Sequence, residues 1–404
     1  MPSLTMGSPI ASEEKDVCVV IIGAGPAGLA TAASLNYANV PNIVLEKDNV
    51  CAPLWKRRAY DRLKLHLAKE FCSLPHMSLP WKLPKYVPRA AFVSYLDTYA
   101  SHFHVDPLYN RTVLSASYDE AAARWRVEAR NTTTVVEVDD HHGPLLETYL
   151  ARYLVVATGQ NCEGIIPDVP GLEGFSGEWM HSSEYQNGLG LTGKNVLVVG
   201  CGNSGMEISY DLSNYDAKAS IVVRHPVHVL TTGIVYIGMK MLKFLPTSMV
   251  DKVVVFLSRL KYGRVAKKHG IRRPDEGPFF LKEKTGKTPT IDVGVMRMIK
   301  MGKIKVRPGL TRIEGDTIEF EDGKKARFDA IIFATGYRST VRKWLKGGED
   351  VFNANGMPVV GFSKGWKGDH GLYCAGFSQM GLAGISKDAM NIANDIILSL
   401  SPLK

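Results

Sequence analysis

Two glycine-rich hexapeptides carry the residues of this chain whose types and spacing could do chemistry. In each, the first glycine permits a tight turn, the second lets the backbone approach a pyrophosphate, and the third lets a helix pack closely on a strand. The start of that helix offers free N–H groups and a partial positive charge to phosphate oxygens. Both hexapeptides therefore predict dinucleotide binding by the residues Gly23, Ala24, Gly25, Pro26, Ala27 and Gly28, and by Gly200, Cys201, Gly202, Asn203, Ser204 and Gly205.

The residue types at the ends of the following strands distinguish the two sites. The first site is followed by NIVLEK, where Glu46, 23 positions beyond Gly23, can bind ribose hydroxyls, with Lys47 beside it. The second site is followed by ASIVVRHP, in which Arg224 closes the strand and no carboxylate is present. Because an arginine at this place favours a 2′-phosphate, the second site is predicted to prefer NADPH over NADH, unless Arg224 is only a solvated strand end.

Two dinucleotide sites in one chain suggest that a reduced nicotinamide passes hydride to a bound flavin, so FAD is expected at the first site. A disulfide reductase would need a C-x-x-C pair beside the flavin, and the six cysteines of this chain form none. They also lack metal-ligand spacing, so no metal site is expected. The electrons must reach another acceptor, and O2 is the obvious one.

Strand, turn and helix signals around these motifs predict an α/β fold with two Rossmann-like dinucleotide-binding domains. The tripeptide Ala-Thr-Gly ends a strand in both halves, at 157–159 and 334–336, and marks the places where the chain passes between domains, with Thr335 and Gly336 at the junction. Residues 113–130 and 132–138 suggest a small antiparallel sheet. The FAD domain is thus expected to be discontinuous in sequence. The predicted divisions are a tail without fixed structure over 1–16, the first part of the FAD domain over 17–165, the NADPH domain over 166–330 with a basic and apolar insertion over about 227–305, and the returning part of the FAD domain over 331–404.

A third motif, FSGEWMHSSEY, stands between the two glycine turns. Its residues Phe175, Gly177, His181 and Tyr185 fit the pattern F-x-G-x-x-x-H-x-x-x-[FY], the fingerprint of flavin-dependent monooxygenases. The sequence FATGY over 333–337 is a second hallmark of the N-oxygenating and related class. We expect His181 and Tyr185 to join the two domains and to hold the nicotinamide cofactor against the flavin. The alternative is that His181 is an ordinary histidine in a connector.

From residue 17 to the C-terminus the chain resembles the plant YUCCA family of class B flavoprotein monooxygenases. The segments LWKRRAYDRLKLHLAKEFCSLP, PTIDVG, IKVRPG and GLAGISKDA carry this resemblance. It implies a flavoprotein oxidoreductase that uses FAD, NADPH and O2 to convert a small aromatic 2-oxo acid, indole-3-pyruvate, into the auxin indole-3-acetate by oxidative decarboxylation through a flavin C4a-(hydro)peroxide. Alternatives on the same fold are oxygenation of an amine, a thioether or an oxime precursor, or attack on another 2-oxo acid such as phenylpyruvate. An alternative of another class is a catalytically silent flavoprotein that serves as a redox-sensing partner.

The resemblance also places further residues near the flavin. Trp55 and Lys56 lie in the segment expected against the isoalloxazine and ribityl chain, although Trp55 could equally belong to the core. His66 stands where animal-type flavin monooxygenases carry an asparagine, so their oxygenating arrangement cannot be copied here, and His66 either contacts the flavin or only packs. The reaction demands no side-chain acid or base, and His66 and Asn203 are the candidates for a catalytic part.

Positive charge is concentrated in one stretch of the chain. The formal charge is +9, and residues 259–305 contain 14 Lys and Arg against four Asp and Glu. This stretch is either a solvated basic face, an attraction for anionic cofactor and substrate, or a contact with an anionic membrane surface. Nucleic acid binding is not expected, because interleaved aromatic residues and a recognition-helix pattern are missing. The neighbouring apolar run over 227–260 could wall an aromatic substrate pocket, dock on a membrane or pack as buried helices.

The start of the chain carries no apolar segment of the kind found in secretory signals, and no run of 18 uninterrupted apolar residues occurs. A cytoplasmic protein is therefore expected, with association with the surface of the endoplasmic reticulum left open. The sequence makes no prediction of the oligomeric state.

Overall fold

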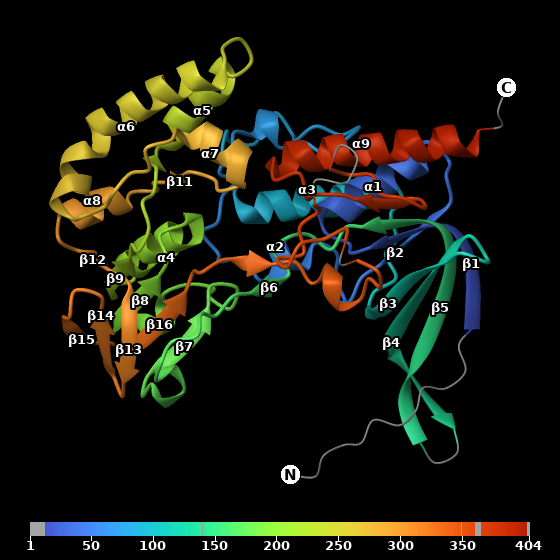
Figure 1. Cartoon of the computed structure of the whole chain (residues 1–404), viewed down its shortest axis with the longest axis horizontal. Coiled ribbons are helices and arrows are strands. Elements are labelled where there is room, and N and C mark those ends of the chain that lie inside the picture. The colour runs from blue at the N-terminus through green and yellow to red at the C-terminus, as the bar shows by residue number, and fades with distance from the viewer. Residues whose placement is uncertain (1–12, 139–140, 349, 360–364, 402–404) are drawn as a thin grey trace.

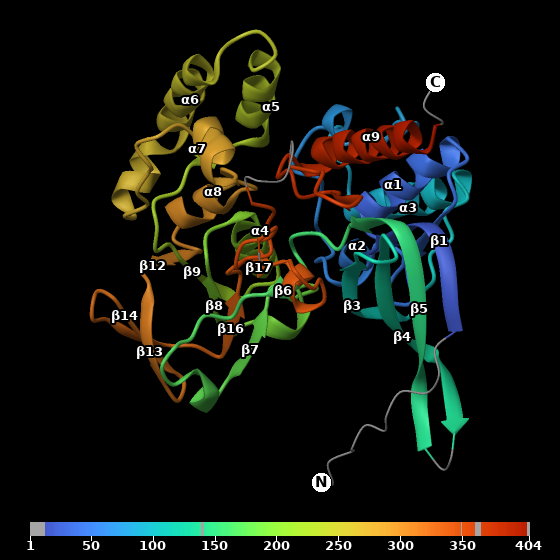
Figure 2. The same cartoon turned by 45° about the vertical axis from the view of Figure 1, so that its right-hand side comes forward.

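The computed structural model describes residues 13–138, 141–348, 350–359 and 365–401. Two α/β units lie side by side, each built on its own sheet (Figures 1 and 2). The blue start and the red end of the chain meet in one unit, which we call the first unit, and the green-to-orange middle forms the second unit (Figure 1). The C-terminal strand and helix therefore return to the unit in which the chain began.

The first unit contains a six-stranded sheet in the order β2-β1-β5-β4-β3, with β18 pairing beside β5. Strands β2, β1, β5 and β18 run parallel, whereas β3 and β4 extend the sheet in antiparallel fashion. The predicted small antiparallel sheet is thus continuous with the main sheet, because the long strand β5 pairs with both β1 and β4. The strands are β1 (Glu13–Ile22), β2 (Asn42–Leu45), β3 (Arg111–Asp119), β4 (Arg124–Val138), β5 (His141–Val156) and β18 (Leu372–Cys374).

Helices cover one face of this sheet (Figure 1). They are α1 (Pro26–Tyr37), α3 (Arg89–His102) and α9 (Gly381–Leu400), and α1 packs against both of the others. Because α1 follows the first glycine turn and α9 closes the chain, the fold brings opposite ends of the sequence to one core. The buried core between sheet and helices includes Ile21, Leu29, Phe92 and Ile392.

The prediction of a tail without fixed structure over 1–16 is wrong for its last four residues. Strand β1 begins at Glu13, and Glu13–Asp16 pair in parallel with residues 147–150 of β5. The polar residues EEKD do not end the strand, because β5 is long enough to offer backbone partners beyond the apolar run. Residues 1–12 lie outside the described residues.

The second unit contains a five-stranded parallel sheet in the order β12-β9-β8-β16-β7. The predicted domain boundary after residue 330 falls within this sheet. Strand β16 pairs with both β8 and β7, and all four of its residues are buried, so this central strand belongs wholly to the second unit. The strands are β7 (Glu178–His181), β8 (Asn195–Val199), β9 (Lys218–Val222), β12 (Lys305–Arg307) and β16 (Ala330–Phe333).

Helix α4 (Asn203–Asn214) follows the second glycine turn and connects β8 to β9. A small antiparallel sheet, β13 (Leu310–Glu314), β14 (Thr317–Phe320) and β15 (Lys325–Arg327), leads from β12 to β16. The insertion lies between β9 and β12 at the outer side of the second unit (Figure 1). It contains β10 (Val229–Leu230), α5 (Thr232–Met241), α6 (Thr247–Lys268), α7 (Pro278–Thr285), β11 (Thr290–Ile291) and α8 (Val295–Lys300).

The two units are joined where the Ala-Thr-Gly tripeptides leave β5 and β16. Soon after each tripeptide the chain forms a short strand, and these two strands, β6 (Glu163–Gly164) and β17 (Tyr337–Arg338), pair in antiparallel fashion. The remaining helix of the first unit is α2 (Pro53–Arg57). Single turns of 3-10 helix occur at Lys69–Phe71, Leu172–Gly174, Leu189–Leu191 and Val341–Lys343.

Candidate functional site

The two glycine turns have the same construction. Gly23 and Gly200 have φ values of +105° and +114°, which residues with a side chain rarely adopt. A Cβ on Gly23 would also approach the carbonyl oxygen of Ala157 to 2.8 Å, and one on Gly200 would collide with that of Ala334. Each Ala-Thr-Gly tripeptide therefore packs against the glycine turn of its own unit. Only glycine permits this approach.

A cavity of about 590 Å³ opens beside the first turn. A Cβ added to Gly25 would meet no atom within 4 Å, so the turn presents a bare backbone to open space at the start of α1. This cradle, the free helix N-terminus and the size of the cavity fit a large phosphate-bearing ligand. Residues from both ends of the chain line it, among them Gly23, Gly25, Pro26, Ala27, Glu46, Lys47, Trp55, Arg58, Arg111, Thr158, Lys343, Gly376 and Leu382.

Glu46 organises the rim of this cavity. Its carboxylate accepts hydrogen bonds from the backbone N–H of Ala24, at 2.7 Å, and of Asp48, at 3.0 Å. Burial raises the pKa of Glu46 above its ordinary value, although these bonds oppose the effect. The carboxylate of Glu46, which is predicted to bind ribose hydroxyls, therefore also fixes the glycine turn.

Trp55 lines the cavity and packs edge-on against Phe92, with ring centroids 4.6 Å apart, so it is both a core residue and a wall residue. Lys56 has a different environment. Its ammonium group donates to Asp97 at 2.6 Å and to the Cys51 sulfur at 3.3 Å, and Lys56 is not among the described residues that line the cavity. Lys56 therefore has polar partners within the first unit, and its contact with the flavin stays a prediction.

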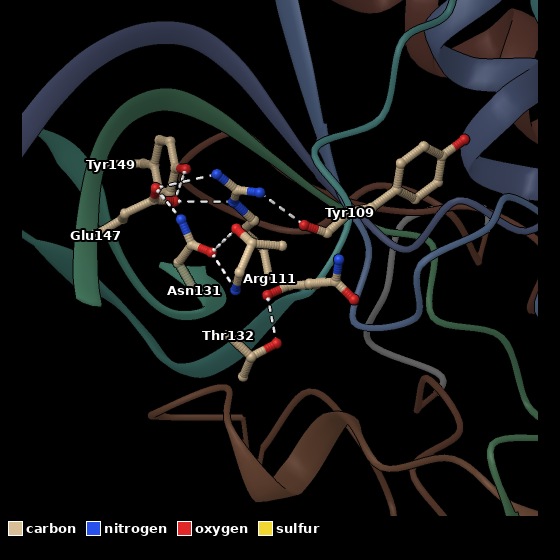
Figure 3. A network of polar contacts seen from close by, with 8 residues as sticks. Tyr109, Arg111, Asn131, Thr132, Glu147 and Tyr149 are labelled. Carbon is tan, nitrogen blue, oxygen red and sulfur yellow. Dashed lines mark hydrogen bonds and ion pairs between the residues drawn. The ribbon is translucent and has the colours of Figure 1, made fainter. Parts of the chain in front are cut away.

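A polar network supports the cavity wall at the start of β3 (Figure 3). The guanidinium of Arg111 donates to the carbonyl oxygen of Tyr109 at 2.7 Å and to both carboxylate oxygens of Glu147 at 3.3 Å. Glu147 also accepts from Asn131 at 3.0 Å and from Tyr149 at 2.5 Å. Burial opposes the charged form of Glu147, but these donors outweigh it and hold its pKa below the ordinary value. No local sequence pattern predicts this network, because its side chains come from three different strands.

The second glycine turn is tied to the insertion. The side-chain oxygen of Asn203 accepts the N–H of Ile291 at 2.8 Å, and the hydroxyl of Thr290 donates to the carbonyl oxygen of Cys201 at 2.8 Å. Asn203, a candidate for a catalytic part, thus has a structural bond to β11. A Cβ on Gly202 would meet no atom within 4 Å, as at Gly25. This second bare backbone faces open space at the start of α4.

Arg224 lies just beyond the C-terminal end of β9 and is exposed. Its Nε donates to the ring of the neighbouring His225 at 2.9 Å, and among the described residues it has no carboxylate partner. A guanidinium in this place is available to a phosphate group.

His181 closes the junction between the units. It is buried at the end of β7, with Nε2 3.1 Å from the carbonyl oxygen of Gly336 and Nδ1 2.9 Å from the hydroxyl of Ser183. Its ring also stands edge-on to Tyr337, at 4.8 Å, and leaves no room for a side chain at Gly164. Burial lowers the pKa of His181, so the neutral imidazole is favoured, with the Nε2 proton donated to Gly336. The hydroxyl of Thr335 donates to the carbonyl oxygen of Ile165 across the same crossing.

Tyr185 begins a second connection. Its buried hydroxyl donates to Asp211 of α4 at 2.7 Å. The next residue, Gln186, accepts the backbone N–H of Asp61 at 2.9 Å and donates to the carbonyl oxygen of Arg57 at 3.0 Å. The end of the fingerprint motif therefore lies between α4 of the second unit and the 57–61 segment of the first.

Glu207 is a residue that the sequence reasoning missed. It is buried on α4, and its carboxylate forms an ion pair with Arg62 of the first unit, Nε to Oε2, at 3.0 Å. The Arg62 guanidinium also lies over the ring of Tyr210, 4.4 Å from its centroid, and His66 Nε2 stands 3.7 Å from Glu207 Oε1. His66 thus faces α4 and is not among the described residues lining the 590 Å³ cavity. The sequence did contain a signal for this contact, because Glu207 is a carboxylate in the helix that follows the GCGNSG motif.

Comparison with known proteins identifies the family. The family model for flavin-binding monooxygenase-like proteins matches residues 15–342. The Arabidopsis thaliana protein named probable indole-3-pyruvate monooxygenase YUCCA10 is 50% identical over 96% of this chain and 99% of its own length. The rice (Oryza sativa subsp. japonica) indole-3-pyruvate monooxygenase YUCCA4 is 46% identical over 98% of this chain and 91% of its own length.

Solved structures show the same fold. A flavin-containing monooxygenase from Stenotrophomonas maltophilia superimposes with a TM-score of 0.70 at 22% identity, over 96% of this chain and 100% of its own. Cyclohexanone monooxygenase from Rhodococcus sp. Phi1, bound to NADP+, gives a TM-score of 0.71 at 16% identity, over 96% and 85%. The predicted α/β fold with two dinucleotide-binding domains is confirmed. The chain is therefore a flavin-dependent monooxygenase by family. It belongs to the flavin-binding monooxygenase-like family and, within that family, to the YUCCA group.

Proposed function

We propose that this chain catalyses the oxidative decarboxylation of indole-3-pyruvate to indole-3-acetate. Indole-3-pyruvate, O2, NADPH and a proton give indole-3-acetate, CO2, NADP+ and water, so one oxygen atom enters the acid and the other leaves as water. The observation that carries the proposal is the 50% identity, over nearly the whole of both chains, to a relative named for this reaction. The paired glycine turns and the junction at His181 supply a physical framework for it.

FAD, when bound in the cavity of the first unit, supplies the redox chemistry that activates O2. The residues of this chain would bind and orient the cofactors and the substrate and would exclude water from them. Gly25 and the start of α1 would receive the pyrophosphate, with Glu46 fixing the turn and reaching the ribose. In the second unit, Gly202 and α4 would receive the NADPH pyrophosphate and Arg224 its 2′-phosphate. We assign no general acid or base.

In this proposal His181, His66 and Asn203 are positioning residues. His181 holds the β6 and β17 crossing, and its neutral ring keeps a proton on Nε2 for the Gly336 carbonyl oxygen. His66 and Asn203 act through protein contacts, the first facing Glu207 and the second holding β11. A fixed crossing would hold the two cofactor sites in a constant relation to each other, which would favour productive orientation and help to exclude water.

We further propose a cytoplasmic setting with contact to the endoplasmic reticulum surface. All six cysteines are free, which suits a reducing compartment. None of the helices in the described part of the chain combines the length and apolar character needed to cross a membrane.

Product analysis tests the substrate. The purified holoenzyme would be supplied with NADPH and, in separate reactions, with indole-3-pyruvate, phenylpyruvate, an aliphatic 2-oxo acid, a tertiary amine and a thioether. We expect indole-3-acetate and CO2 in step with NADPH oxidation, and a higher kcat/KM for indole-3-pyruvate than for the other compounds. Coupled oxygenation of the amine or thioether without turnover of indole-3-pyruvate would replace the proposal by its alternative. Absence of NADPH oxidation with every compound would favour a silent flavoprotein.

A further inference from the structure

An apolar stripe runs along the outer side of helix α6. Met249, Val253, Phe256 and Leu260 are spaced by four, three and four positions, so their side chains lie on one face of the helix. They are 52%, 38%, 59% and 70% exposed. The opposite face packs into the insertion, where Val250, Val254, Ser258 and Tyr262 are buried. The helix is therefore apolar on two faces, and only one of them has a partner among the described residues.

The stripe continues into the loop between α5 and α6. Phe244 is 85% exposed and Leu245 is 37% exposed. Figures 1 and 2 show this loop at the far end of the hairpin formed by the two helices, away from the body of the second unit. Large apolar side chains gathered on one outer surface mark an interaction site, whereas scattered single residues need no explanation.

The same helix is strongly basic on its solvent-exposed side. None of its exposed cations forms an ion pair with a described carboxylate. The single acidic residue of α6, Asp251, is buried and accepts the backbone N–H groups of Phe279 and Phe280, at 2.9 and 3.0 Å. The exposed charge on this helix is thus entirely positive. The cations are Lys252, Arg259, Lys261, Arg264, Lys267 and Lys268.

The hairpin is held in a fixed direction. On α5, Lys240 forms an ion pair with Glu70 of the first unit at 2.8 Å, and the ammonium group of Lys85 lies 3.1 Å from the centroid of the Tyr236 ring. The inner side of α5 packs on α6. Since both units hold the inner side of the hairpin, the outer stripe has a defined orientation relative to the two cofactor sites.

We propose that this outer face, made of Phe244, Met249, Val253, Phe256 and Leu260 with the surrounding cations of α6, rests on the surface of an anionic lipid bilayer. Apolar side chains can enter the boundary between head groups and acyl chains, while lysine and arginine remain among lipid phosphates. Each cation near an anionic leaflet adds to the attraction. A second copy of this chain is a poorer occupant, because it would bring the same cations and no exposed carboxylate of α6 to the contact.

Vesicle co-sedimentation with the FAD-loaded full chain tests the proposal. We expect binding to vesicles of phosphatidylcholine mixed with phosphatidylserine, weak binding to phosphatidylcholine alone, and a loss of binding as salt is raised. The variant Phe256→Glu/Leu260→Glu should lower the partition coefficient roughly tenfold or more. The variant Lys261→Glu/Lys267→Glu should lower it on anionic vesicles only.

A matched control is Leu398→Glu, which changes a 75% exposed leucine near the end of α9 in the first unit and should leave partition unchanged. Flavin absorbance and NADPH oxidation in solution show that each variant is folded, and these readouts do not depend on lipid. Equal partition of the parent, the stripe variant and the control would overturn the proposal. So would a lipid-independent dimer that Phe256→Glu/Leu260→Glu converts to a monomer in light scattering, because the face would then serve self-association. This lipid contact rests on the membrane-surface contact of the proposed function and not on the proposed reaction. Because lipid binding is measured without substrate, its failure leaves the reaction standing, and a failure of the reaction leaves lipid binding standing.

Discussion

At the scale of single residues, His181 is the clearest case of a side chain whose position explains its part. Its two ring nitrogens contact Gly336 and Ser183, so one imidazole ties the fingerprint motif to the second Ala-Thr-Gly tripeptide. The burial that lowers its pKa keeps the ring neutral, and a neutral ring satisfies both contacts at once. A histidine in this state positions the junction and needs no part in proton transfer.

His181→Ala should leave FAD bound and make NADPH oxidation wasteful. The cavity of the first unit does not include His181, but the junction that orders the two units loses its contact with Gly336. We expect several-fold more H2O2 for each NADPH oxidised, measured against indole-3-acetate formed. Ser183→Ala keeps the Gly336 contact and serves as the control. Unchanged coupling in His181→Ala would make the motif a linker.

Arg224→Asp should weaken the preference for NADPH. The exposed guanidinium is available to a 2′-phosphate, and a carboxylate in its place would repel that group while accepting ribose hydroxyls. We expect the ratio of kcat/KM for NADPH to that for NADH to fall by about tenfold or more. His225→Ala, which removes the hydrogen-bonded neighbour but keeps the charge, should change this ratio little. If Arg224→Asp leaves the ratio intact, Arg224 is a solvated strand end.

At the scale of elements, helix α9 carries a carboxylate to the loop after β18, which borders the cavity of the first unit. Asp388 is buried and accepts the backbone N–H of Gly376, which follows β18 and lines the cavity, at 3.0 Å. Burial raises the pKa of Asp388 to about 6. Asp388 thus joins the helix to the loop after β18, and its carboxyl group binds a proton more tightly in the folded chain than in the unfolded chain.

The elevated pKa of Asp388 has a predictable effect on stability. The folded chain retains this proton up to about pH 6, whereas the unfolded chain loses it near pH 4, so stability falls as pH rises through this window. Asp388→Asn keeps an acceptor for Gly376 but cannot titrate. Urea unfolding of both proteins should therefore show the parent losing stability relative to the variant between about pH 4 and pH 6. Parallel pH profiles would show that Asp388 titrates normally.

At the scale of the whole molecule, the two units are coupled by buried polar contacts as well as by the chain itself. The ion pair between Arg62 and Glu207 joins the first unit to α4, the helix that starts at the second glycine turn. Tyr60 shares a hydrogen bond with Ser204 beside this pair. The position of α4 therefore depends on residues of the first unit.

Glu207→Gln should destabilise the folded chain by about 2 to 3 kcal/mol, because it leaves a largely buried guanidinium without its counter-ion. A quarter of the Arg62 side chain remains exposed, which keeps the effect below that of a fully buried pair. We also expect a higher KM for NADPH than in the parent. Glu178→Gln removes the partner of an exposed pair with Lys194 and should cost less than about 0.5 kcal/mol in urea unfolding. If both substitutions lower the free energy of unfolding equally, Glu207 does not couple the two units.

The sequence by itself determined the features that depend on neighbouring residues. Strand, glycine turn and helix follow one another within about twenty residues in each unit, so local sterics and hydrogen bonding were enough to predict them. The repeated Ala-Thr-Gly tripeptides and the fingerprint motif indicated two dinucleotide sites and a junction. The family resemblance supplied the reaction class, which spacing alone could not.

The tertiary structure decided the features that depend on residues distant in the chain. Arg62 meets Glu207, Gly336 meets His181, and the network of Arg111 and Glu147 forms only when three strands are side by side. It also directed Lys56 to Asp97. Among the residues that the structure describes, it left one face of α6 without a partner, although the sequence of α6 is apolar on both faces. A local pattern fixes which backbone forms; which side chains become buried, paired or exposed is set by packing between segments, and that information is not contained in any one segment.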